Sequence, residues 1–186
     1  MNVTKTNPVG IDIPLQKLQT LLHGKLITAW DLSGTPMDYQ CYGRCYRNKT
    51  DNGYVAEYFT GIENKYQEVY FDSQYKAISF FGIGQEMTED KGFLKGDVHL
   101  VFFVDLAKLK PAIDHRADEE VRKDVIAAIG GNNYGFNFTG IELSLENVLQ
   151  EYPGSRRDDR LKYIDMHPIH CFRINFDFLI DKNNCY

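Results

Sequence analysis

The sequence has no long hydrophobic run and few cysteines. No stretch approaches the roughly 18 consecutive apolar residues that a membrane-spanning helix needs. The opening residues, MNVTKTNPVGIDIP, lack the apolar core of a signal peptide. Four cysteines among 186 residues, with no signal for secretion, indicate reduced thiols rather than a disulfide framework. We therefore expect a protein that is not secreted through a signal peptide and does not bind a membrane.

An excess of positive charge is also missing. The chain carries 26 acidic and 21 basic residues, which gives a formal net charge of −5. Such a chain gains nothing from the counterion release that drives non-specific binding to nucleic acids. The basic residues between 156 and 162 are interrupted by Asp158 and Asp159, a pattern typical of a solvated loop. We expect no sequence-specific binding of nucleic acid.

Aromatic residues are abundant, with twelve Tyr, twelve Phe and one Trp. Apolar residues make up 43% of the chain and charged residues 25%, which is the ordinary range of a folded globular protein. Aromatic side chains favour strands and association surfaces. The composition therefore predicts a folded chain rich in β structure that associates with a partner.

In the first half of the chain, the spacing of apolar residues changes from that of a helix to the alternation that is typical of strands. A flexible segment, residues 1–13, is expected to precede a short helix that starts at Pro14 and ends at Gly24, with leucines on one face. Residues 39–83 alternate in hydrophobicity and contain Asn52-Gly53, a pair that favours a tight hairpin turn. This pattern predicts a meander of about four strands.

The second half contains one apolar strand and the strongest helical pattern. Residues 98–106 are almost continuously apolar, which predicts a central strand covered on both faces, with His99 as a core residue whose polar atoms are satisfied. Residues 114–129 predict an amphipathic helix capped by Asp114.

Two polar segments, residues 84–96 and 153–162, are expected to be loops, the first of them mobile. The whole chain, residues 1–186, is thus expected to be a single α+β domain. In this domain a leading short helix and one main amphipathic helix pack on a mostly antiparallel sheet.

The stretch DMHPIHC, residues 165–171, is the densest group of residues with metal-binding or catalytic chemistry. Asp165, His167 and His170 would be able to hold a metal ion if a tight turn brought them together. Side chains alternate along the final strand, however, so His170 faces the core, whereas Cys171 and Arg173 face solvent or a neighbour. We therefore expect a buried strand-end histidine, with no catalytic residue, no metal and no cofactor.

Two groups of residues are candidates for an association surface. Alternation places Tyr42, Arg44 and Tyr46 on one strand face, and Tyr and Arg are enriched at interfaces. The segment 84–96 carries Met87, Phe93 and Leu94 among charged residues, as expected of a segment that a neighbouring subunit orders. We expect the chain to form a homo-oligomer through these residues.

The order of elements, with VHLVFFVDL leading into HRADEEVRKDVIAAI and YIDMHPIHCFRINFDF at the end, resembles that of the small α/β neck and tail-completion proteins of long-tailed bacteriophages, notably tail terminators. The resemblance implies a structural protein without cofactor or catalytic residues, located in the bacterial cytoplasm or the virion. It also implies a ring, commonly of six subunits, that contacts phage tail or head-connector proteins. In such a ring an acidic lining suits the passage of DNA, in keeping with the negative net charge.

Two other classes of function are open. One is a metal-dependent hydrolase that uses Asp165, His167 and His170. The other is a binding module that presents Tyr42, Tyr46, Tyr54 and Tyr58 to a carbohydrate or a peptide. Metal analysis distinguishes the first class, and a ligand-induced change in tyrosine fluorescence the second.

Overall fold

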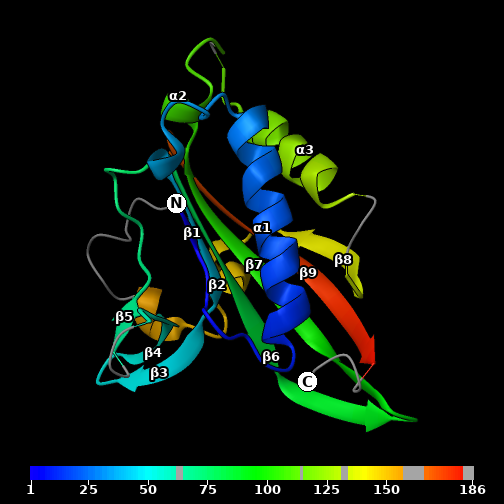
Figure 1. Ribbon diagram of the computed structural model, residues 1–186. Helices are drawn as coiled ribbons and strands as arrows, with labels where there is room; N and C mark the ends of the chain where they lie inside the picture. Colours follow the sequence, from blue (N-terminus) through cyan, green and yellow to red (C-terminus); the bar gives the residue numbers. More distant parts are fainter. Residues whose placement is uncertain (62–64, 114, 131–133, 157–165, 182–186) are drawn as a thin grey trace.

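The computed structural model describes residues 1–61, 65–113, 115–130, 134–156 and 166–181. These residues form an α+β structure built around a six-stranded sheet in the order β1-β2-β6-β7-β9-β8 (Figure 1). The strands are β1 (Asn2–Val3), β2 (Tyr39–Arg44), β6 (Ala77–Asp90), β7 (Phe93–Asp105), β8 (Phe136–Glu142) and β9 (Ile169–Asp181). The first three lie parallel to one another and the other pairings are antiparallel. The α+β class is confirmed, and the sheet is mostly antiparallel, as expected, with parallel pairing only where β1, β2 and β6 meet.

The apolar strand predicted to be central is β7, between β6 and β9. Leu100 and Phe102 on one face and Val101 and Phe103 on the other are all at most 2% exposed. Alternation sends the two pairs into two separate cores, one on each side of the sheet. A strand covered on both faces needs apolar residues at every position, which explains the continuous run in the sequence.

Helices α1 (Asp12–Ala29) and α3 (Asp118–Ile129) cover one face of the sheet (Figure 1). The leucine stripe of α1 is buried against the strands, as are Val121 and Val125 of α3. Helix α1 is longer than expected, because packing on the sheet carries it through Gly24. Helix α3 begins at Asp118 rather than near residue 114, and the expected cap Asp114 lies outside the described residues. No helix among the described residues is long and apolar enough to cross a membrane.

The amino-terminal segment is not the flexible tail that the sequence suggested. Residues 2–3 pair with β2 in parallel, and α1 already begins at Asp12. The side-chain amide of Gln19 on α1 donates to the carbonyl oxygen of Val3 at 2.8 Å and to that of Cys41 at 2.9 Å. These bonds tie the segment to both α1 and β2.

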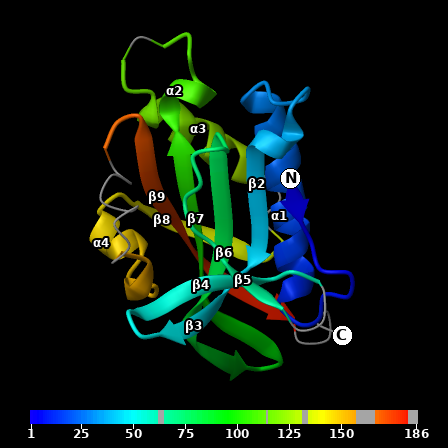
Figure 2. The ribbon, with the colours of Figure 1, turned by 90° about the vertical axis from the view of Figure 1, so that its left-hand side faces the viewer.

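A second layer covers the other face of the sheet (Figure 2). It consists of the antiparallel strands β3 (Tyr46–Thr50), β4 (Gly53–Phe59) and β5 (Tyr66–Glu68) together with the short helices α4 (Leu145–Val148) and η2 (Pro153–Arg156). The hairpin predicted at Asn52-Gly53 joins β3 to β4, and Gly53 has the positive φ of +118° that the turn requires. Two further short helices, η1 (Pro36–Asp38) and α2 (Leu106–Leu109), flank β2 and β7.

The expectation of one continuous meander over residues 39–83 is wrong. Strands β2 and β6 are parallel neighbours, and parallel neighbours require a long crossover rather than a hairpin. Strands β3 to β5 form that crossover, leaving the main sheet at Cys45. A crossover of this kind is a long-range feature that alternation within each strand does not reveal.

Residues 84–96, expected to be a mobile loop, are the outer halves of β6 and β7. Lys91 and Gly92, with φ of +51° and +85°, form the turn between them. The hairpin extends past the end of β2 and away from the helices (Figures 1 and 2). Residues 85–92 are all exposed, so the hairpin has no buried face there to impose an alternating pattern.

Of the expected polar loop 153–162, residues 153–156 form η2 and the rest lies outside the described residues.

Candidate functional site

The histidine-rich stretch does not assemble a metal site within the described residues. His170 is 3% exposed and faces the helical layer, as predicted. Guanidinium nitrogens lie next to both ring nitrogens, with Arg122 2.9 Å from Nε2 and Arg116 3.2 Å from Nδ1. Positive charge on both sides of the imidazole disfavours a bound cation.

The other members of the expected metal set lie elsewhere or are not described. His167 lines a cavity of about 340 Å³ together with His115 and Arg116, and Asp165 lies outside the described residues. Across the described ranges, no group of three His, Cys, Asp or Glu side chains is placed to hold a metal ion.

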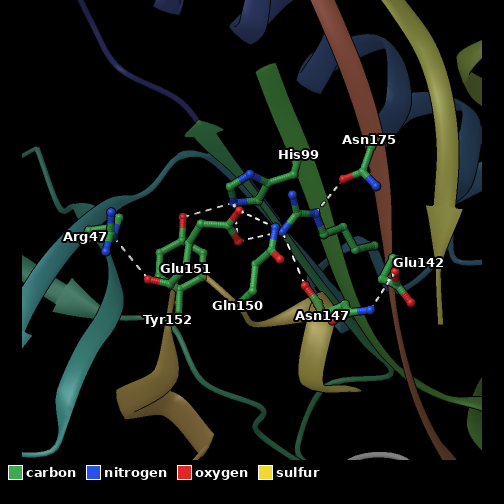
Figure 3. Close-up of polar contacts among 9 residues, drawn as sticks. Arg47, His99, Glu142, Asn147, Gln150, Glu151, Tyr152 and Asn175 are labelled. Carbon is green, nitrogen blue, oxygen red and sulfur yellow. Dashed lines mark hydrogen bonds and ion pairs between the residues drawn. The ribbon is translucent and has the colours of Figure 1, made fainter. Parts of the chain in front are cut away.

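The second layer contains a buried polar network that the sequence did not reveal (Figure 3). Arg173 on β9 donates through Nη1 to Oε2 of Glu151 at 2.5 Å and through Nε to Oδ1 of Asn175 at 2.5 Å. His99 on β7 lies 3.3 Å from the hydroxyl of Tyr152 and 4.0 Å from Glu151. The network therefore links the neighbouring strands β7 and β9 to the segment between α4 and η2.

The outer contacts of the network hold that segment against the rest of the layer (Figure 3). Arg47 on β3 donates to the main-chain carbonyl of Glu151 at 3.1 Å. Asn147 donates to Glu142 on β8 at 3.1 Å. The segment is thus tied to both the small sheet and the edge of the large one.

Burial suppresses the charge of His99. Its side chain is 1% exposed, and burial together with the nearby Arg173 lowers its pKa to about 3, against the opposing effect of Glu151. Burial disfavours the ionised form of Glu151, but the pKa of the carboxyl is nevertheless lowered, and with His99 neutral the charged partner that favours the carboxylate is the guanidinium of Arg173, which also donates a hydrogen bond to it, as does Gln150.

The network has the residue types of a catalytic site but no access for a substrate. His99 and Tyr152 are each 1% exposed, and Glu151 and Arg173 are each 8% exposed. Gly82 on β6 packs so closely that a Cβ atom there would overlap both His99 and Tyr152. We therefore interpret the network as structural.

An open groove lies between the two sheets. Its volume is about 380 Å³, within the usual range for a small-molecule site. Four tyrosines from β2, β4 and the segment between β5 and β6 line it: Tyr42, Tyr58, Tyr70 and Tyr75. The rings of Tyr42 and Tyr58 pack with their centroids 4.4 Å apart. The groove therefore places aromatic and polar side chains where a ligand can reach them.

Sequence reasoning identified only part of the groove. Tyr42 and Tyr58 were named as candidates for ligand binding, whereas Tyr70 and Tyr75 were not. The signal was present in the segment YQEVYFDSQY, where tyrosines recur among Gln, Glu and Asp. Nothing in that segment indicates that it folds back against β2, because the crossover is a long-range feature.

The predicted association residues do not form one surface. Tyr42 lines the groove, whereas Arg44 and Tyr46 meet at the base of α1. There the Arg44 guanidinium lies 4.8 Å from the Tyr46 ring centroid. Nζ of Lys5 donates to the Tyr46 hydroxyl at 2.8 Å and to the buried Asp12 at 2.5 Å.

The remaining candidates are divided between the hairpin and the small sheet. Met87 and Phe93 on the hairpin are 51% and 40% exposed. Leu94 packs against the core on the helical side. Tyr54 does not line the groove. Its ring lies under Arg47, with 4.2 Å between the ring centroid and the guanidinium carbon.

Comparison of the chain with protein-family models, with curated proteins and with solved structures finds no match. The exposed hairpin of β6 and β7 and the groove are therefore the features of the molecule that bear on its function.

Proposed function

We propose that this protein is a non-enzymatic structural subunit that assembles into a homo-oligomeric ring, of the kind formed by phage tail-completion proteins. The observation that carries the proposal is the exposed hairpin of β6 and β7. The resemblance in element order to tail terminators supports the same class, with tail or head-connector proteins as further partners.

The hairpin has the properties of a surface that a neighbouring subunit covers. Strand β2 pairs with β6 only as far as Phe81, so the outer edge of residues 86–90 has no partner strand among the described residues. An unpaired strand edge offers main-chain donors and acceptors to another chain. The exposed side chains of Met87 and Phe93 add apolar area that burial in an interface would remove from water.

A hairpin that reaches a different surface of the next subunit produces a head-to-tail contact. Such a contact closes into a ring when the rotation between subunits allows it, and otherwise produces a filament.

Light scattering at several concentrations tests the proposal. The wild-type protein is expected to form a discrete oligomer, and Met87→Asp/Phe93→Asp a folded monomer, because both substitutions place charge in the interface. Leu94 is left unchanged because it contributes to the core. The control Met37→Asp/Ile126→Asp alters two side chains that are 55% and 42% exposed elsewhere, and should assemble like the wild type.

Negative-stain electron microscopy of the oligomer is expected to show closed rings. A wild type that stays monomeric at every concentration, or one that forms only open filaments, would contradict the proposal.

A further inference from the structure

A small cavity lies where helix α1 meets the ends of strands β1, β2 and β4. Residues 3–5 line it, together with Asp12 and Gln19 of α1 and with Gly43 and Arg44 of β2. The centre of a water molecule can move through about 20 Å³ within this cavity. Since about 10–15 Å³ of such space is enough for one water molecule, the cavity accommodates a molecule of that size and little more.

Two buried oxygen atoms of the lining residues have no hydrogen-bond partner among the described residues. They are Oε1 of Gln19, a residue that is fully buried, and Oδ1 of Asp12, which is 6% exposed. The amide nitrogen of Gln19 donates to the carbonyl oxygens of Val3 and Cys41, so the orientation of the amide is fixed and Oε1 is an acceptor. A buried acceptor without a donor destabilises the fold, so both atoms need a donor that the described residues do not supply.

The guanidinium of Arg44 lies at a distance from Asp12 that suits a bridging molecule. Nη1 of Arg44 is 3.9 Å from Oδ1 of Asp12, which is too long for a direct hydrogen bond. A water molecule can bridge a polar contact of that length, because it accepts from one group and donates to the other. The lining therefore offers one donor and two acceptors to a molecule in the cavity.

The charges around the cavity disfavour an ion as its ligand. Nζ of Lys5 donates to Oδ2 of Asp12 at 2.5 Å and to the hydroxyl of Tyr46 at 2.8 Å. Burial opposes the charge of Lys5, but these hydrogen bonds outweigh burial and raise its pKa, so the ammonium group stays protonated. A further cation would be repelled by Lys5 and Arg44, and an anion would face two acceptor oxygens.

We propose that this cavity binds one water molecule, which donates to Oε1 of Gln19 and Oδ1 of Asp12 and accepts from Arg44. Water is neutral, fits the volume and both donates and accepts, and three partners are the usual number for a buried water molecule. The bound water connects α1 to the end of β2, just before the chain leaves the main sheet. This site is independent of the hairpin surface proposed for assembly.

A high-resolution crystal structure of the wild-type protein tests the proposal. We expect one ordered water molecule within about 2.7–3.2 Å of both Oε1 of Gln19 and Oδ1 of Asp12. Crystals soaked in rubidium bromide, whose two ions both scatter anomalously, should show no anomalous peak in the cavity. An anomalous peak there would indicate an ion site and overturn the proposal, as would a cavity without ordered density.

Gly43→Ala is designed to displace the water molecule. A Cβ atom at this position would lie 2.8 Å from Oε1 of Gln19, the distance at which a hydrogen-bonded oxygen lies. Gly43 does not have a positive φ, so alanine is compatible with the backbone. The matched control is Gly140→Ala, also in a strand, where nothing lies within 4 Å of a Cβ atom.

NMR measures the effect of both substitutions in solution. A nuclear Overhauser effect between water protons and the side-chain amide protons of Gln19 is expected in the wild type and in Gly140→Ala, and should be lost in Gly43→Ala. Its absence from the wild type, or its persistence in a folded Gly43→Ala protein, would contradict the proposal. Should Gly43→Ala fail to fold, the crystal structure and the NMR spectrum of the wild type decide the question without it.

Discussion

Arg173 on β9 and Glu151, between α4 and η2, form an ion pair with 2.5 Å between Nη1 and Oε2, and each side chain is only 9% exposed. Because Arg173 also donates to Asn175, the guanidinium is oriented from two directions. The pair joins the sheet to the segment that covers it, so its loss should affect how the second layer packs.

Removing one member of this pair should be more harmful than removing both. Arg173→Leu or Glu151→Leu leaves a buried charge without its partner, which typically costs about 3–5 kcal/mol. The double variant Arg173→Leu/Glu151→Leu should recover a large part of that loss. Urea denaturation of the four proteins gives the coupling, and strictly additive effects would show that the two side chains do not depend on each other.

Gly82 is required because His99 and Tyr152 approach its Cα closely. A Cβ atom at this position would overlap both side chains, so Gly82→Ala should destabilise the fold by about 1–3 kcal/mol or more. Gly24→Ala is the control, because nothing lies within 4 Å of a Cβ atom there, and alanine in a helix should stabilise by about 0.4–1 kcal/mol. Thermal unfolding of both variants measures the contrast, and a Gly82→Ala protein as stable as the wild type would refute the packing at His99.

The free energy of unfolding should decrease as the pH falls below 6.5, the ordinary pKa of histidine. In the folded state the pKa of His99 is lowered to about 3, whereas its ordinary value is 6.5. Between these values the unfolded chain binds a proton that the folded protein does not, so acid favours unfolding. The lowered pKa of Glu151 acts in the same direction at lower pH, because stability that depends on the ionised carboxylate is lost as that group is protonated.

A His99→Gln variant isolates this effect. The unfolding free energy of the wild type should decrease more steeply than that of the variant, by about 1 kcal/mol per pH unit between pH 6 and pH 5. His23, whose pKa is also lowered by burial, contributes equally to both proteins and cancels in the difference. Parallel pH profiles would show that His99 is protonated in the folded state.

Features that depend on nearby residues were predictable, and those that depend on distant ones were not. The apolar run of β7, the alternation of β9 and the Asn52-Gly53 turn each follow from the local sequence, and the structure contains all three. The parallel pairing of β2 with β6 depends on a crossover and has no local signal. Residues 84–96 form strands by pairing with each other, although their exposed side chains show no period.

The sequence predicted single residues of the buried polar network but not how they come together. His99 was correctly expected to be buried, but its polar atoms are not all satisfied as expected, because Nδ1 has no hydrogen-bond partner among the described residues. The neighbouring Glu151 and Arg173 come from distant segments that meet only in the folded protein. The odd-numbered face of β9 was expected to meet solvent or a neighbour. Cys171 and Arg173 are instead buried under the second layer of the same chain.

The packing of α3 on the sheet makes adjacent residues respond differently to the same substitution. Val125 is fully buried between α3 and the strands, whereas Ile126, the next residue, is 42% exposed. Val125→Asp would place a carboxylate without a partner in an apolar core and should cost about 3–5 kcal/mol. Ile126→Asp introduces the same residue with the same helix propensity, but its side chain remains in water.

Thermal unfolding of both variants, monitored by circular dichroism, measures this difference. We expect Val125→Asp to melt far below the wild type or to remain unfolded, and Ile126→Asp to change the free energy of unfolding by no more than about 1 kcal/mol. Because the two residues are adjacent and the substitution is identical, helix propensity and net charge cannot account for a difference. Equal melting temperatures for the two variants would mean that α3 presents another face to the sheet, and the core on the helical side would have to be revised.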